Sequence, residues 1–158
     1  MSYERSGTIT PKRSLPFPDR LLAVHDALFG LLEEMDPDEV AVESAFIRPN
    51  SKSALAALQI GHVRGVVLLA ARRSRASIFE YTAPEVKLAV ARQGAAAKQQ
   101  VMFMVRRLLP GVDRVTEDEA DALAVALCHA HRAPARALFT LPSATPRRQV
   151  PPAPRSKR

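Results

Sequence analysis

Along the chain, segments whose apolar residues have a helical spacing alternate with short runs of consecutive apolar residues. Within residues 19–35, Leu, Val and Met recur every three or four positions, which is the spacing of one buried helix face. Proline, glycine and capping residues divide the remaining pattern into further helices. The sequence predicts helices at residues 19–35, 49–73, 85–90, 97–109 and 118–131. In the fourth of these, Val101, Met104, Val105 and Leu108 are predicted to face the core.

Three short runs, residues 6–10, 40–43 and 77–81, are predicted to be strands. The run at 40–43 is apolar without alternation up to Glu43, which is typical of parallel strands covered by helices on both faces. Strands alternating with helices indicate an α/β fold. Because a central strand needs more neighbours than these runs supply, we expect a further strand upstream of Met1.

Length and composition predict one domain with a tail. The 158 residues divide into an expected core at 1–133 and a basic Pro/Arg-rich tail at 134–158, which we expect to be disordered because it has little apolar content. Apolar residues make up 47% of the chain, which is enough for a core. A single cysteine, Cys128, excludes an internal disulfide and is predicted to be a small buried residue. No Cys/His spacing of a zinc site is present.

The longest purely apolar run, residues 65–71, is too short to span a bilayer. Polar residues follow Met1, so the sequence shows no secretory signal. We therefore expect a cytoplasmic protein without a membrane segment.

Charge is segregated along the chain. Residues 1–131 hold sixteen Lys/Arg and sixteen Asp/Glu, so the whole net charge of +7 lies in residues 132–158. Residues 44–112 carry eleven basic and two acidic residues, whereas 113–121 carry five acids and one arginine. An acidic cluster surrounded by basic residues suits a protein that acts on a polyanion. The basic residues would bind the polyanion, and a metal ion bound by the acids would cut it. A merely basic chain is the alternative, but the pattern favours nucleic-acid binding.

Three carboxylates are candidates for that metal site. Glu43 ends an apolar strand, where a carboxylate is costly to desolvate unless it is paired or metal-bound. Asp118 and Asp121 lie three residues apart at a helix start, hence on one helix face. Oxygen ligands on a strand end and a helix start suit Mg²⁺. The alternatives are a solvated strand end for Glu43, a favourable helix dipole for Asp121 and an N-cap for Asp118.

Five motifs occur in order and together resemble the RuvC family, the bacterial Holliday-junction resolvases, over about residues 2–131. They lie at residues 40–46, 53–65, 79–87, 97–106 and 120–126. The resemblance implies an RNase H-like fold, with a mixed sheet flanked by helices. It also implies a homodimer that resolves four-way junction DNA by paired symmetric cuts and works with the branch-migration machinery. The implied cofactor is Mg²⁺, two ions per subunit, with Mn²⁺ as a substitute.

The same resemblance assigns roles to individual residues. It makes Glu43, Asp118 and Asp121 metal ligands. Lys87 and Lys98 match basic positions near the scissile strand, although an exposed lysine is the common alternative. Arg64 is expected to clamp phosphate.

Phe46 is expected either to stack on an unpaired base or to pack in the core. His129 and His131 are interpreted as packing or surface residues rather than ligands.

The chain departs from the family pattern in two places. The family's opening strand, with a Gly-x-Asp-Pro-Gly type motif and a metal-binding aspartate, is not present, and neither Glu4 nor Asp19 has a matching context. The helix between Phe46 and Gly65 is about three residues, or one turn, longer than the pattern. Either Met1 is a downstream start, which we favour, or the metal site is incomplete. We expect residues 1–158 alone to cut poorly.

The function predicted from the sequence is a Mg²⁺-dependent, structure-selective DNA endonuclease. Two alternatives are a non-catalytic protein that binds four-way junctions and another RNase H-like nuclease with a different substrate.

Overall fold

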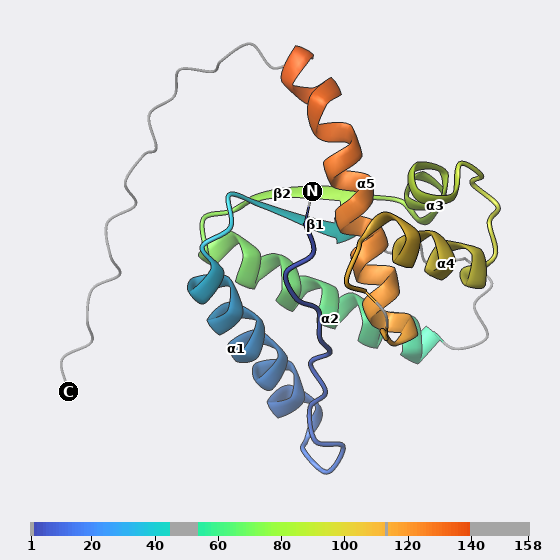
Figure 1. The fold of residues 1–158 in the computed structure, drawn as a ribbon. Coiled ribbons are helices and arrows are strands. Elements are labelled where there is room, and N and C mark those ends of the chain that lie inside the picture. Colours follow the sequence, from blue (N-terminus) through green and yellow to red (C-terminus); the bar gives the residue numbers. More distant parts are fainter. Residues whose placement is uncertain (1, 45–53, 113, 140–158) are drawn as a thin grey trace.

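The computed structural model describes residues 2–44, 54–112 and 114–139, the last six of them by their backbone alone. Figure 1 shows a small sheet with helices on both sides. The described elements are α1 (Phe17–Met35), β1 (Glu39–Glu43), α2 (Ala54–Arg73), β2 (Ser77–Tyr81), α3 (Ala83–Ala91), α4 (Lys98–Leu108) and α5 (Glu117–Phe139).

The two strands run parallel, with Glu39 opposite Ser77 and Glu43 opposite Tyr81. Since parallel strands need a long crossover, α2 supplies the connection between them. The strands predicted at 40–43 and 77–81 are confirmed, and the α/β class with them. Both strands end at the same edge of the sheet, which places Glu43 there.

The two faces of the sheet pack against different helices. Val40 and Ile78 contact the α1 and α2 layer, in a cluster around the buried Leu32. Ala41 and Phe79 point the other way, into the larger core that α3, α4 and α5 form. In Figure 1, α1 and α2 lie side by side on one side of the strands, and α5 crosses the other. Coverage on both faces explains why these strands carry apolar residues without alternation.

The larger core fixes α5 against α3 and α4. Its fully buried side chains come from all three helices, as Val90, Val105, Leu127 and Cys128 show. Cys128 is thus the small buried residue that was predicted. Burial raises the pKa of its thiol, which keeps it protonated and unreactive.

Three sequence predictions about elements are wrong. Residues 6–10 form no strand; their segment lies along the start of α5, where Ser6 bonds to Glu119, and has no strand partner in the described sheet. Leu108 lies at the surface, since the buried face of α4 is formed by Val101 and Val105.

The last helix continues to Phe139 instead of ending at His131. Its alanine-rich sequence favours helix strongly enough to tolerate Pro134, which removes one backbone hydrogen bond. The start predicted for α2 at residue 49 lies outside the described residues. Of the tail predicted at residues 134–158, residues 134–139 belong to α5, and residues 140–158 lie outside the described part.

One described helix, α2, is long and apolar enough by length and composition to cross a membrane, with a mean hydropathy of 1.6 and 11% of that window buried. The longest uninterrupted apolar run did not predict this, because glycines, a histidine and Arg64 divide the helix. Here α2 packs along α1 and against β2. Its exposed apolar side chains therefore form a surface feature of the domain.

Candidate active site at the strand ends

A pocket of about 200 Å³ lies where β1 ends and α5 begins, between α3 and α4. Four of the predicted site residues line it: Glu43, Lys87, Lys98 and Asp121. Its floor is apolar, built from Ala83, Val86, Val101, Ala124 and Val125. Two carboxylates and two ammonium groups thus meet over an apolar base at the edge where open α/β sheets keep their sites.

Glu43 reaches the pocket because it is the last residue of β1 and shares a strand face with Ala41, which points toward α5. The backbone beyond it is held in place: the Ser44 N–H donates to the Tyr81 carbonyl at 2.8 Å. The carboxylate of Glu43 is exposed, so the expected desolvation is wrong. The strand tip is open to solvent and therefore accessible to a metal ion and a phosphate.

Arg64, on α2, binds the other side of this strand end. Its guanidinium donates to the backbone carbonyl of Glu43 at 2.8 Å and also pairs with the Glu80 carboxylate. Arg64 was predicted to clamp phosphate. The structure places it at the site's edge, where the Glu43 carbonyl and Glu80 engage two of its five N–H donors.

The start of α5 is set by a capping box. The Oγ1 of Thr116 accepts from the Glu119 N–H at 3.3 Å, and the Glu119 carboxylate accepts from the Thr116 N–H at 2.8 Å. Ser6 donates a further hydrogen bond to this carboxylate at 2.9 Å. The bond from the Thr116 backbone, followed by the two hydroxyl bonds, lowers the pKa of Glu119. Thr116 is thus the N-cap, which excludes that role for Asp118.

Lys98 lies between two carboxylates of α5. Its Nζ is 3.1 Å from an oxygen of Glu117 and 3.1 Å from an oxygen of Asp121. Hydrogen bonds to Glu117 and then Asp121 raise the pKa of Lys98, so the group stays charged. All three side chains are substantially exposed, and such pairs are individually weak. The ammonium group can therefore leave Asp121 when a metal ion or a phosphate arrives.

Asp118 does not line the pocket, although it precedes Asp121 by about one turn. Within residues 2–44, 54–112 and 114–139, no group of three or more His, Cys, Asp or Glu side chains lies close enough to hold a metal ion. Glu43 and Asp121 nevertheless share a wall. Mg²⁺ is commonly bound by one or two carboxylates and completes its shell with water and phosphate oxygens. The carboxylates of Glu43 and Asp121 match the kind and number of protein ligands that one Mg²⁺ ion takes.

Lys87 is carried by α3, whose start has a second capping box. The carboxylate of Glu85 accepts from the Thr82 N–H at 2.9 Å and from Arg132 of α5 at 2.8 Å. The Thr82 backbone bond, then the Thr82 hydroxyl and Arg132, lower the pKa of Glu85. These bonds fix the start of α3 against α5, which sets Lys87 over the pocket.

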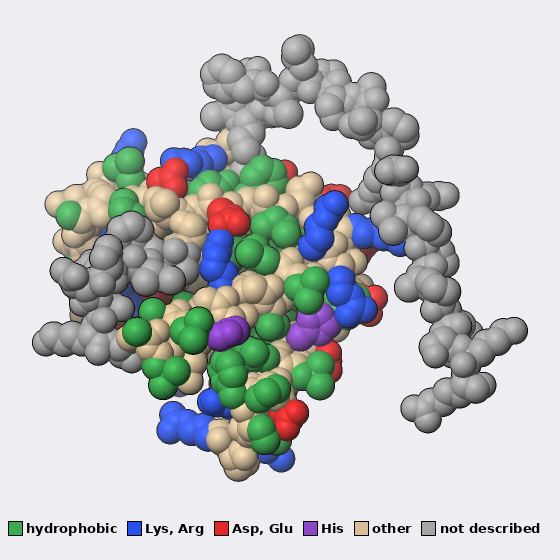
Figure 2. Space-filling view, turned by 180° about the vertical axis from the view of Figure 1, so that it is seen from behind, with side chains coloured by type: hydrophobic (Ala, Val, Ile, Leu, Met, Phe, Trp, Pro, Cys, Tyr) green, Lys and Arg blue, Asp and Glu red, His purple; other side chains and the backbone are tan. Residues whose placement is uncertain are grey.

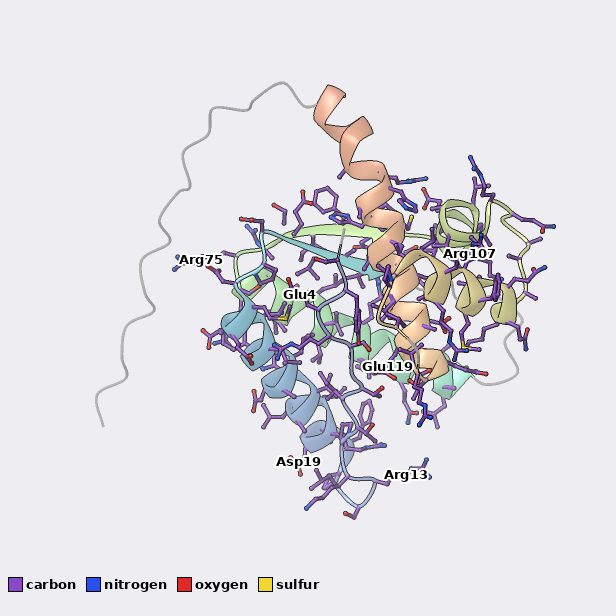
Figure 3. All side chains as sticks on the ribbon, viewed as in Figure 1. Glu4, Arg13, Asp19, Arg75, Arg107 and Glu119 are labelled. Carbon is purple, nitrogen blue, oxygen red and sulfur yellow. The ribbon has the colours of Figure 1, made fainter. Side chains whose placement is uncertain are left out.

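Other sequence predictions fall away from the pocket or outside the described part. Asp19 lies in the first turn of α1, and Figure 3 shows it well apart from Glu119 on α5. Phe46 lies outside the described residues.

Sequence reasoning missed two side-chain networks near the site. Arg64 with Glu80 is one, and His129 with Glu39 and Tyr81 is the other. A histidine amid apolar helix positions was the available signal for the second. Nothing in the local pattern signals the first, because its partners are distant in sequence.

Comparison with known proteins identifies the family. The profile described as "Crossover junction endodeoxyribonuclease RuvC" matches residues 1–129. The chain belongs to the RuvC family. The RuvC of Paramagnetospirillum magneticum is 46% identical over 131 residues, which cover 83% of this chain and 77% of that protein. The RuvC of Granulibacter bethesdensis is 45% identical over 84% of this chain and 73% of that protein.

Solved RuvC structures have the same fold. The structure titled "T. thermophilus RuvC in complex with Holliday junction substrate" is 33% identical, has a TM-score of 0.69, and covers 79% of this chain and 74% of that one. A second Thermus thermophilus RuvC structure gives a TM-score of 0.68 at 32% identity, over 81% of this chain and 76% of that one. The RNase H-like fold expected from the resemblance is confirmed. So is membership of a family of hydrolytic endonucleases of DNA recombination and repair, which implies use of a divalent metal ion.

Proposed function

We propose that this RuvC chain cuts four-way DNA junctions at the pocket between β1 and α5. The Thermus thermophilus neighbour was solved with a Holliday junction substrate, and the relatives carry the name of crossover junction endodeoxyribonucleases. The observation that carries the proposal is local: Glu43 and Asp121 come from a strand end and a helix start, and share one pocket with Lys87 and Lys98. Ligands for a cation beside ligands for phosphate are what metal-assisted phosphodiester hydrolysis needs.

We assign the cation ligands to Glu43 and Asp121 and the cation to Mg²⁺, with Mn²⁺ as a substitute. Both carboxylates line the pocket, Glu43 exposed and Asp121 half-exposed, and can give oxygen atoms to a hard ion. When bound, such an ion activates water and stabilises charge on the phosphate. The predicted second ion requires Asp118, about one turn away, and further oxygen ligands beyond those that line the pocket.

The cationic residues hold the substrate. Lys98 and Lys87 flank the carboxylates, so a phosphate near the cation meets both ammonium groups. Arg64 supports the strand end through the Glu43 carbonyl and Glu80, which engage two of its five N–H donors, so contact with a phosphate falls to the other three. The apolar floor beneath these groups keeps the polar atoms at the pocket rim, where the DNA backbone passes.

The test compares Glu43→Gln and Asp121→Asn with the parent in junction binding and junction cleavage. Each is made in residues 1–158, which are expected to cut poorly alone, and in a version extended upstream of Met1. Each change keeps the shape of the side chain and removes a ligand charge. We expect cleavage to fall by more than tenfold, which is about 1.4 kcal/mol of barrier, while junction binding persists. Glu117→Gln is the matched control, since Glu117 also pairs with Lys98 but does not line the pocket. A variant that keeps cutting near the parent rate is not a ligand variant.

The same assay separates the two alternative functions. A parent protein that binds junctions tightly and never cuts them with Mg²⁺ or Mn²⁺, even in the version extended upstream of Met1, is a junction-binding protein. A parent that cuts linear or hybrid duplexes better than junctions is another kind of RNase H-like nuclease.

We also propose that two copies act together on the junction, because a two-fold dimer matches two symmetric cuts. An exposed apolar surface supports this proposal. An apolar groove between α1 and α2 is lined by Leu21, Ala57, Leu58, Gly61, His62, Gly65, Val66 and Leu69. Figure 2 shows hydrophobic side chains gathered around two histidines on the face seen from behind. A second copy that covers α2 would explain why so apolar a helix is exposed.

The remaining proposals concern the cellular setting. We propose a cytoplasmic location and cooperation with the branch-migration machinery, as the family resemblance implies. For residues 142–158, which carry five Lys/Arg and no acid, we propose a loose electrostatic tether to DNA.

A further inference from the structure

His129 connects α5 to both strands of the described sheet. Its Nε2 lies 2.8 Å from a carboxylate oxygen of Glu39 on β1, and its Nδ1 lies 2.9 Å from the hydroxyl of Tyr81 on β2. The ring also packs against Phe79, with the ring centroids 4.9 Å apart. The side chain is only 13% exposed. One imidazole thus contacts three side chains from two different strands, outside the pocket.

The chemistry of these partners gives the hydrogen bonds a direction. A carboxylate can only accept, so Nε2 carries the proton toward Glu39. In the neutral ring Nδ1 is then an acceptor, and the Tyr81 hydroxyl donates to it. Both ring nitrogens have a defined role, which leaves the ring one orientation. The contact therefore fixes the rotation of α5 as well as its distance from the sheet.

The network involves the same elements that form the pocket. Glu39 and Glu43 are the first and last residues of β1 and share its α5-facing side. Tyr81 is the β2 partner of Glu43 in the strand register. His129 follows Asp121 on α5 by slightly more than two helical turns. A slip of α5 by one residue would move Asp121 by about 1.5 Å along the helix and rotate it by about 100°.

We propose that His129 is a positioning residue: by locking α5 to Glu39 and Tyr81, it places Asp121 opposite Glu43 so that both carboxylates can hold one divalent cation. The proposal rests on the proposed function of the pocket. Arg132 extends the lock by a turn, since it pairs with Glu85 on α3 at 2.8 Å and lies over the Tyr81 ring at 5.5 Å. His129 itself touches neither the cation nor the substrate.

The test uses three variants: Tyr81→Phe and Glu39→Gln each change one partner of the imidazole, and His129→Gln removes the ring that makes both hydrogen bonds. Mn²⁺ serves as the probe, and its affinity is measured from the electron paramagnetic resonance signal of the free ion. We expect each change to weaken Mn²⁺ binding by about tenfold, the lower end of the loss seen for outer-shell partners of metal sites. Junction binding in metal-free buffer should stay the same, and cleavage should need more Mg²⁺ for half its maximal rate.

His131→Gln is the matched control, because His131 lies on the same helix and forms a hydrogen bond to the Ala89 carbonyl, at 3.3 Å, instead of bonds to the strands. Tyr81→Phe and Glu39→Gln preserve side-chain shape, and thermal unfolding of each variant shows how much stability is lost. Unchanged Mn²⁺ affinity in all three variants would overturn the proposal. So would an affinity loss that merely follows the unfolding temperature and recurs in His131→Gln.

The outcomes also separate this proposal from the proposed function. If the parent binds Mn²⁺ but cuts no junction, the endonuclease proposal fails for this chain. A weaker Mn²⁺ affinity in His129→Gln, Tyr81→Phe and Glu39→Gln would then still support the positioning role. If the parent binds no Mn²⁺, the metal site and the positioning role are both overturned.

Discussion

Lys98 has opposite effects on the two ligands proposed for the pocket. Its ammonium group competes with a metal ion for Asp121, and it attracts the phosphate of the substrate. When no substrate is bound, the ammonium group of Lys98 therefore occupies the position beside Asp121 that a metal ion would take. Metal and DNA binding should be linked through this one side chain.

We predict that Lys98→Met tightens Mn²⁺ binding and slows junction cleavage. Removal of the exposed ion pair should raise Mn²⁺ affinity by up to about fivefold, because Asp121 loses a competitor. The cleavage rate should fall by about tenfold or more, because the phosphate loses a partner. Mn²⁺ titration and single-turnover cleavage on one preparation check both effects. Lys12→Met, at an exposed N-terminal position, is the control. Weaker Mn²⁺ binding in Lys98→Met would contradict the competition.

Position at a strand end and near a helix start suggested Glu43 and Asp121 from the residues themselves, whereas Lys87 and Lys98 were assigned to the site only through the family resemblance. Sequence reasoning could not separate Asp118 from Asp121. Their spacing puts both on one helix face, yet only Asp121, about one turn after Asp118, lines the pocket. The three-dimensional partners of Arg64 and His129 were equally inaccessible, since such contacts leave no periodic signal in the sequence.

At the scale of elements, hydrogen bonds from three residues fix the start of α5. Thr116 and Glu119 satisfy each other's backbone, and Ser6 ties the N-terminal segment to the same carboxylate. Glu119 is therefore a structural acid next to two candidate ligands. The acids of this first turn differ in role because their partners differ: Glu119 bonds to Thr116, and Glu117 pairs with Lys98.

We predict that this cap makes stability depend on pH in the acid range. The pKa of Glu119 is lower in the folded state than the ordinary value of about 4.3. The folded state thus favours the carboxylate, so this stabilisation is complete above the ordinary value and is lost as the pH falls through the lowered one. Thermal unfolding between pH 3 and pH 7 should show a steeper acid decline for the parent than for Glu119→Gln.

Two further variants complete that experiment. Thr116→Ala removes the N-cap and should cost about 1 kcal/mol at neutral pH. Glu33→Gln, an exposed change on α1, should leave the acid decline of the parent intact. Equal acid declines for the parent and Glu119→Gln would show that other carboxylates control the transition.

Periodicity predicted the helices and the paired strands because their apolar faces are regular. It was wrong for residues 6–10, where strand propensity has no partner in the described sheet, and for the end of α5, where alanine outweighs Pro134. These errors share a cause. Local preference decides a segment only when the neighbours it needs are present.

At the scale of the whole molecule, two apolar surfaces have different uses. The core between the sheet and α3, α4 and α5 holds the site together, and the groove between α1 and α2 faces solvent. The sequence predicted α/β layering from the order of elements. It did not predict the exposed apolar face, because the hydrophobic pattern of α2 looks the same whether a neighbouring domain, a membrane or a second copy covers it.

We predict that a second copy covers this face and that Leu58→Glu separates the two copies. Leu58 is 57% exposed in the single chain and lines the groove. A buried glutamate at a two-fold interface would lie in apolar surroundings, which is costly.

Leu88→Glu on α3 is the matched control, since Leu88 is also 57% exposed but lies on another helix. Sedimentation should show a dimer for the parent and the control, and a monomer for Leu58→Glu. The monomer should nick junctions on one strand instead of making paired cuts, and a monomeric parent at assay concentration would contradict the assignment.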